Sequence, residues 1–124
     1  MIPRFRAWDD WRKKMSVVDR IYIDTKGVRL YDNFGEYWRN FRDAKLMQST
    51  GLKDKNGKEI FEGDIVDYKG RKAVVKWHGS YASFIYRFVD EMQERVSEWH
   101  PLFLAYYHFE IIGNIYENKE LLDA

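Results

Sequence analysis

Short stretches in which apolar and polar residues alternate dominate the first third of the chain, and this period-two pattern predicts β-strands. The strands predicted there are residues 4–8, 15–18, 21–23 and 28–31. Residues 25–27 end in a glycine between the last two strands and predict a hairpin. The charged stretch 9–14 predicts another turn. Residues 36–45 are ambiguous: Tyr37, Phe41 and Lys45 have the spacing of a helical turn, but their aromatic density also suits an irregular cover.

From Leu46 onward, glycine turns divide the chain into further short apolar segments. The turns are expected at Thr50–Gly51, Asn56–Gly57, Glu62–Asp64 and Lys69–Gly70. The strands predicted in this part are residues 65–68, 72–78, 82–89, 102–107 and 110–116, with a bulge or a close approach at Gly113. Segments of this length, rich in β-branched and aromatic residues, are typical of a small barrel or sandwich.

One amphipathic helix is predicted over residues 91–99. Asp90 is in position to cap it, with Gln93 reaching back to the Asp90 amide, and Pro101 ends it. Met92, Val96 and Trp99 fall on one face. A short final turn is expected from Asn118 to Leu122. We therefore expect a mainly β fold with minor α, formed as a single domain over 1–124 with sub-lobes 1–45 and 46–124. The residues predicted to be buried are Ile65, Val75, Trp77, Ile112 and Ile115.

The composition narrows the classes of function. The chain has 124 residues and no cysteine, which excludes disulfides, thiolate zinc sites and cysteine nucleophiles and favours a reducing cytoplasm. Its longest apolar stretch, residues 102–107, is far shorter than the ~18 residues of a membrane-spanning helix, so we expect no membrane association. The net charge of +1 gives no overall attraction to nucleic acid.

The motifs that bear chemistry favour structural interpretations. A calcium loop fits neither with Asp54 nor with Leu52 as its first residue, because Lys58 in the one frame and Gly63 in the other falls where an oxygen ligand is required. Asn56–Gly57 instead predicts a tight turn, with positive φ expected at Gly57 or Gly63. The three histidines lack helical metal-ligand spacing, and no phosphate-binding glycine loop is present. No cofactor, metal or small-molecule substrate is expected, and a hydrolase using Glu62 or Asp64 is a minor alternative.

The segment from Leu46 to Val66, LMQSTGLKDKNGKEIFEGDIV, resembles a block of the YopX family of bacteriophage and prophage proteins. The opening IPRFRAWD and the closing EIIGNIYENKELL are similar to the ends of that family. Two positions depart from its pattern, Ser49 and Lys119. The resemblance implies an SH3-like barrel in the C-terminal half and a bacterial host cytoplasm, and it implies no catalytic residues. The block contributes its turn-forming residues as a structural motif: Gly51, Asp54, Asn56, Gly57, Gly63 and Asp64.

Aromatic residues make up 18% of the chain, more than a core of this size takes. Tyr and Trp suit interfaces, so we expect a non-enzymatic protein that acts through protein–protein contacts, as a homo-oligomer or with another phage or host protein. The candidate surface is Trp38, Phe41, Tyr106 and Tyr107. The alternative is a barrel that binds single-stranded nucleic acid through Lys53, Lys55 and Lys58 with Trp77, Tyr81 and Tyr86.

Overall fold

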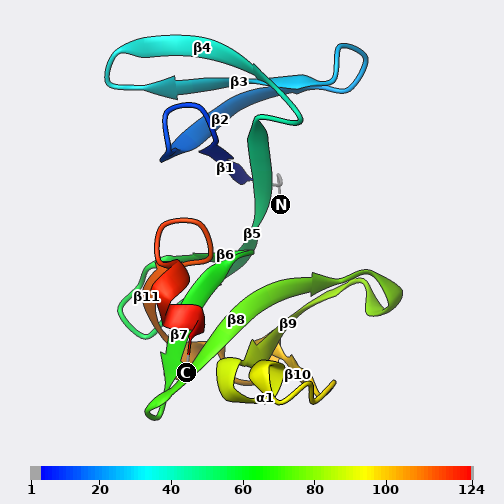
Figure 1. Ribbon diagram of the computed structural model, residues 1–124, viewed down its shortest axis with the longest axis vertical. Helices are drawn as coiled ribbons and strands as arrows, with labels where there is room; N and C mark the ends of the chain where they lie inside the picture. Colours follow the sequence, from blue (N-terminus) through cyan, green and yellow to red (C-terminus); the bar gives the residue numbers. More distant parts are fainter. Residues whose placement is uncertain (1–3, 124) are drawn as a thin grey trace. The chain divides into compact units, whose positions relative to one another are not determined.

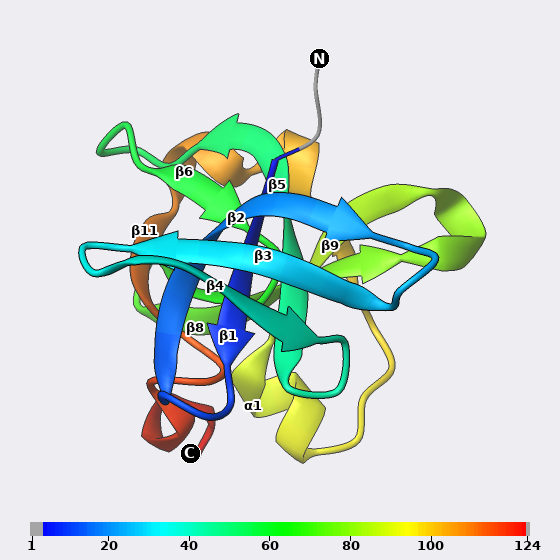
Figure 2. The same cartoon turned by 90° about the horizontal axis from the view of Figure 1, so that it is seen from above.

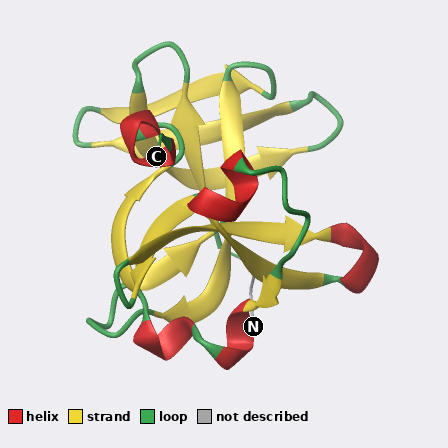
Figure 3. Ribbon diagram, turned by 60° about the horizontal axis from the view of Figure 1, so that its bottom comes forward, coloured by secondary structure: helices red, strands yellow, loops and turns green. Residues whose placement is uncertain are grey.

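The computed structural model describes residues 4–123, and strands make up most of them (Figures 1 and 3). The strands are β1 (Phe5–Asp9), β2 (Lys14–Tyr22), β3 (Gly27–Asp32), β4 (Gly35–Asn40), β5 (Ala44–Lys53), β6 (Glu59–Phe61), β7 (Asp64–Tyr68), β8 (Arg71–His78), β9 (Ser83–Phe88), β10 (His100–Pro101) and β11 (Glu110–Asn114). The helix is α1 (Val89–Gln93), and 3₁₀ helices span Gly79–Tyr81, Leu102–Leu104, Tyr106–His108 and Lys119–Leu122. None of these helices has the length and apolar character needed to span a bilayer.

The chain divides into two compact units between Ser49 and Thr50, and each is described by itself. All strand pairs with an assigned register in the described residues are antiparallel. They fall into two sheets, with strand orders β4-β3-β2-β1-β5-β6 and β10-β9-β8-β7-β11. The mainly β class predicted from the sequence is confirmed.

In the first unit the predicted hairpin is confirmed, because β2 and β3 pair with Tyr22 opposite Gly27 (Figure 2). The small core of this unit contains Ala7, Val28, Leu30 and Ala44. Residues 36–45 form neither a helical turn nor an irregular cover: residues 35–40 are strand β4, which pairs with β3. The residues there follow period two, since Tyr37 packs against the core while Trp38 is 40% exposed.

A buried carboxylate ends strand β1. Asp9 is 0% exposed, and its Oδ1 accepts hydrogen bonds from the Trp11 amide at 2.9 Å, the Arg12 amide at 3.4 Å and Arg39 Nε at 3.0 Å. Arg39 also lies 4.9 Å from the Tyr37 ring centroid. Burial alone would raise the pKa of Asp9, but the hydrogen bonds from Trp11, Arg39 and Arg12 outweigh it and lower the pKa.

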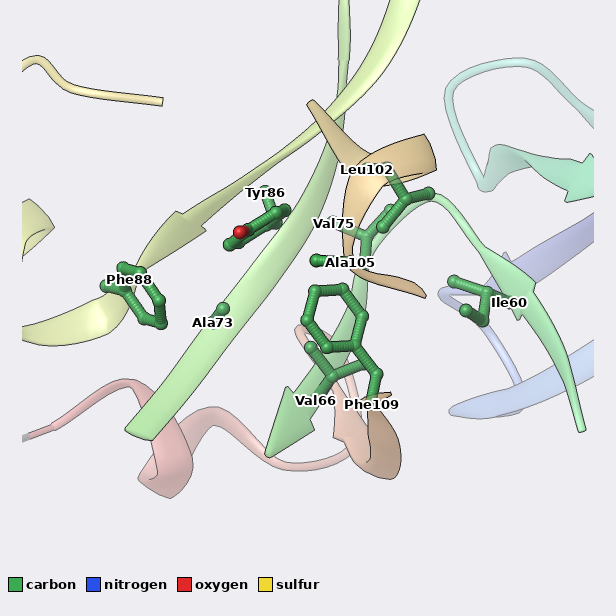
Figure 4. Packing of buried hydrophobic residues seen from close by; sticks show 9 residues of the cluster. All are labelled: Ile60, Val66, Ala73, Val75, Tyr86, Phe88, Leu102, Ala105 and Phe109. Atoms are coloured by element: carbon green, nitrogen blue, oxygen red, sulfur yellow. The ribbon is translucent and has the colours of Figure 1, made fainter. Parts of the chain in front are cut away.

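The sheet of the second unit is covered on both faces. Along β8, Ala73 and Val75 join one core cluster, shown in Figure 4, while Val74 between them joins another. The first cluster also contains Ile60, Val66, Tyr86, Phe88, Leu102, Ala105 and Phe109. The second contains Ile65, Val74 and Val89. A strand with cover on both faces shows a continuous apolar run, which accounts for the sequence of residues 73–75.

The described part of this unit forms no closed barrel, so the SH3-like barrel that the resemblance implied is not confirmed. Closure requires the outermost strands β10 and β11 to pair, and in the sheet order they are the two edges. Strand β10 has only two residues, because the chain turns into the 3₁₀ helix Leu102–Leu104 directly after Pro101. No length of strand is left there to close the sheet.

The helix predicted over residues 91–99 is shorter and starts earlier, as α1. Phe88 occupies the N-cap position, and Gln93 donates to the Leu122 carbonyl rather than to the Asp90 amide. The helix ends because Arg95 adopts φ 59°, with its amide bonded to the Met92 carbonyl and the Val96 amide to the Glu91 carbonyl. These two hydrogen bonds form a Schellman motif, in which glycine usually holds the left-handed position. Because this position holds arginine rather than glycine, the sequence did not indicate that the helix ends here.

Residues 102–107, predicted to be a strand, form 3₁₀ turns instead. The burial prediction holds for Ile65 and Val75, and Ile115 packs at the edge of a core cluster. It is wrong for Trp77 and Ile112, which are 44% and 37% exposed. Trp77 shares the face of Ala73 and Val75 but lies near the end of β8, beyond the part that the core covers.

Two local predictions near the C-terminus are confirmed. The pairing of β7 with β11 shifts register between Ile111 and Gly113, as expected of a bulge. A Cβ at Gly113 would lie 2.5 Å from the Asn118 side chain, so the close approach is present as well. Asn118 begins the final 3₁₀ turn, and its Oδ1 accepts the Asn114 amide. Thr50–Gly51, in contrast, lies inside strand β5 rather than in a turn.

Candidate interaction surface

The distinctive central segment is organised by a buried carboxylate. Asp54 is 5% exposed, and its Oδ1 accepts the amides of Asn56 at 2.9 Å and Lys58 at 2.8 Å. Its Oδ2 accepts the Ile111 amide at 3.0 Å. Gly57 has φ 82°, and its amide donates to the Asp54 carbonyl. Asp54 therefore caps the predicted Asn-Gly turn and ties it to strand β11.

Polar groups on either side of this turn also bond to the backbone. Thr50 Oγ1 donates to the Ile60 carbonyl at 2.7 Å and accepts the Leu52 amide at 3.1 Å. Asp64, 1% exposed, accepts the Phe61 amide at 2.8 Å. Gly63, at φ 89°, donates its amide to the Val75 carbonyl. Positive φ is thus confirmed at both Gly57 and Gly63. The polar side chains of this segment stabilise the conformation of its backbone through hydrogen bonds.

The 3₁₀ segment 102–109 divides its apolar side chains between the core and the surface. Leu102, Ala105 and Phe109 point inward and are at most 5% exposed. The outward side chains are large: Phe103, Leu104 and Tyr107 are 60%, 61% and 55% exposed. A strand would have alternated these positions regularly, whereas the 3₁₀ turns place two outward residues in succession.

An open groove of about 290 Å³ lies beside this segment. Its apolar lining includes Leu52, Trp77, Phe84, Leu102 and Phe103, and we call it the Trp77–Phe103 groove. Trp77 and Phe84, opposite each other on β8 and β9, have ring centroids 5.0 Å apart in an edge-on arrangement. The groove is therefore walled by rings fixed on a sheet, a form that suits apolar side chains of a partner.

The four aromatic residues that the sequence suggested as an interaction surface differ in their exposure to solvent. Tyr107 is 55% exposed and Trp38 is 40% exposed. Phe41 and Tyr106 are partly buried and pack against the cores of their units. Trp38 also has a structural contact, because its ring lies where a Cβ of Gly27 would be, at 2.0 Å. Tyr107 is thus the most exposed of the four candidates.

The residues suggested for nucleic-acid binding are only partly on the surface. Lys53, Lys55 and Lys58 are exposed, as are Trp77 and Tyr81. Tyr86, by contrast, lies in the core at 8% exposure, and burial raises the pKa of its hydroxyl. It is therefore not available for base stacking. Residues 50–124 contain 10 Lys/Arg against 13 Asp/Glu, so this unit has no cationic excess.

Sequence spacing missed one cluster of potential ligands. Glu91, Glu98 and His100 each offer an atom, and the three atoms lie within 4.8 Å of one another. The predicted helix through residue 99 would have separated the two glutamates by about 10 Å along its axis. The early end of α1 brings them together, and no signal in the sequence indicated it.

The fold and the groove together define a small, mainly β protein of two compact units with an exposed apolar surface on the second. A family model described as YopX protein matches residues 4–123, so the chain belongs to the YopX family. Among solved structures it is similar to protein EF1440 from Enterococcus faecalis, with 28% identity and a TM-score of 0.65 over 99% of both chains. Comparison with curated proteins gives no match.

Proposed function

We propose that this protein is a non-enzymatic binding protein that acts through protein–protein contacts, and that a second copy of the chain is its partner. The observation that supports the proposal most is the outward set Phe103, Leu104 and Tyr107 beside the Trp77–Phe103 groove. Large apolar side chains gathered at the surface favour association, because burying them removes apolar area from water.

A second copy is the proposed partner for two physical reasons. An identical chain is present wherever the protein is made, and closed two-fold symmetry covers the same surface on both copies. In the proposed dimer a ring of one copy enters the groove of the other, so the outward residues and the groove supply the two halves of the contact. Family membership favours a phage or prophage setting in the bacterial host cytoplasm, which a cysteine-free chain suits.

The proposal is tested by the mass of variants in solution, measured by light scattering on a sizing column. Phe103→Ser and Tyr107→Ser are expected to shift the protein toward monomer, because truncating a central interface residue costs about 2 kcal/mol or more, roughly 30-fold in affinity. Both side chains are mostly exposed, so the fold should persist.

Phe34→Ser is the matched control, because Phe34 is 92% exposed but lies in the first unit. It should keep the mass of the parent. Equal effects of the Phe34 and Phe103 changes would contradict the assigned surface. Saturable, salt-sensitive binding of a single-stranded oligonucleotide would instead favour the nucleic-acid alternative.

A further inference from the structure

We propose that Glu91, Glu98 and His100 form a site for one divalent transition-metal ion, with Zn²⁺ as the probe. Glu91 lies in α1, Glu98 in the segment that follows, and His100 begins β10. One potential ligand atom from each lies within 4.8 Å of the other two. Two carboxylates with one imidazole make a mixed O/N set of the kind that zinc and its neighbours accept.

Buried atoms without partners point to a missing ligand. Glu91 Oε1 lies 3.4 Å from Arg71 Nη2, but Glu91 Oε2 is buried and has no hydrogen-bond partner within residues 4–123. His100 Nε2 is likewise buried and has no hydrogen-bond partner among the described residues. Buried polar atoms are nearly always satisfied in folded proteins, so two unpaired atoms in one three-residue cluster call for an explanation. An ion between them supplies the missing interaction.

The surrounding residues hold the imidazole and one carboxylate in place. The His100 ring stacks on Tyr86 at 5.2 Å between centroids and meets Phe88 edge-on at 5.5 Å. Strand pairing of His100 with Tyr86 fixes its backbone. Arg71 orients Glu91 through the second oxygen of the same carboxylate. Such supporting contacts are typical of metal sites, where they orient the ligands.

Glu98 completes the cluster from an exposed position. Arg87 Nη2 donates to the Val96 carbonyl at 2.6 Å and Nε to the Glu98 carbonyl at 3.4 Å, which hold the segment against β9. Glu98 itself is exposed, so the site opens to solvent on its side. An ion can enter there, and water can take the remaining coordination position.

The spacing of the ligands allows closure with little movement. Ligand atoms at ~2.1 Å from a tetrahedral zinc ion lie about 3.4 Å apart, so atoms now within 4.8 Å of one another must approach by at most about 1.4 Å. Rotation of the exposed Glu98 side chain supplies this movement. The bound ion would join α1, the segment after it and β10, and would act as a clip that stabilises this part of the second unit.

The test is calorimetric titration of Zn²⁺ into the full chain after removal of metal with a chelator, with the melting temperature as a second measurement. We expect one ion per chain and a higher melting temperature with Zn²⁺ present. Glu98→Gln, chosen because its side chain is exposed, should weaken binding by at least about tenfold, and so should His100→Gln. His108→Gln is the matched control, since His108 is exposed and outside the cluster. It should bind like the parent.

Three results would overturn the site. One is the absence of saturable Zn²⁺ binding at micromolar metal. Another is unchanged affinity in Glu98→Gln. The third is an NMR titration showing His100 as an imidazolium that pairs with Glu91 and is insensitive to added Zn²⁺, because a proton would then satisfy the buried atoms.

Discussion

The turn at Asn56–Gly57 depends on a backbone conformation that glycine adopts at low cost. Gly57 has φ 82°, and a Cβ there would meet nothing within 4 Å, so strain alone decides the effect of a substitution. Gly57→Ala is expected to destabilise the protein by about 1 kcal/mol in urea unfolding.

Gly79→Ala is the control for this prediction. A Cβ at Gly79 also meets open space, but Gly79 lacks a positive φ. Its substitution should be neutral or should stabilise by up to about 1 kcal/mol through the stiffer unfolded chain. If both alanine variants were as stable as the parent, the turn conformation assigned to Gly57 would be refuted.

Asp9 gives a pH-dependent prediction at the same scale. Its folded pKa lies below the unfolded value of about 3.9, so its contribution to stability is complete above that pH. The contribution is lost as the pH falls from about 4 through the folded pKa. Asp9→Asn should lower stability at pH 7 by about 1–3 kcal/mol, because charged hydrogen bonds from Arg39 and two amides are weakened.

Urea unfolding of the parent and of Asp9→Asn over a pH series measures this effect. The difference between the two proteins should be constant near neutral pH and should shrink below pH 4. A difference that stays the same down to acid pH would show that the carboxylate is not responsible.

At the scale of elements, the end of α1 depends on an arginine in a left-handed conformation. Arg95 has φ 59° in the Schellman motif, a position that usually favours glycine. Arg95→Gly should therefore stabilise the protein by about 0.5–1 kcal/mol. Thermal or urea unfolding checks the sign, and destabilisation would show that the Arg95 side chain makes a contribution larger than the backbone strain.

Elements with local signals were predictable from the sequence. Period-two alternation and glycine turns located β1, β2, β3, β7, β8 and β9, and the Asn-Gly pair located the turn at Gly57. The helix end was missed because Arg95 stands where glycine is usual. The 3₁₀ turns of residues 102–109 were missed because six apolar residues in succession have no period that separates strand from turn.

The candidate surface was only partly predictable. A count of aromatic residues indicates that some must be exposed, but it does not say which. Phe41 and Tyr106 pack against their cores, whereas Phe103, which no pattern singled out, is 60% exposed. Whether an aromatic side chain is exposed depends on how far the core of its unit extends. The extent of the core depends in turn on contacts between residues far apart in the sequence.

At the scale of the whole molecule, membership of the YopX family fixes the fold and leaves the partner to experiment. The proposed self-association rests on apolar surface that a folded monomer leaves in water. The fraction of associated chains therefore depends on protein concentration, and so does the apparent stability of the folded chain, since association favours the native state by mass action.

Sedimentation velocity over a hundredfold dilution of the unmodified protein tests this central claim most directly. The account predicts that the average mass falls toward that of one 15.1 kDa chain as the protein is diluted, with a melting temperature that falls in parallel. A single species of 15.1 kDa at every concentration, with a constant melting temperature, would contradict it.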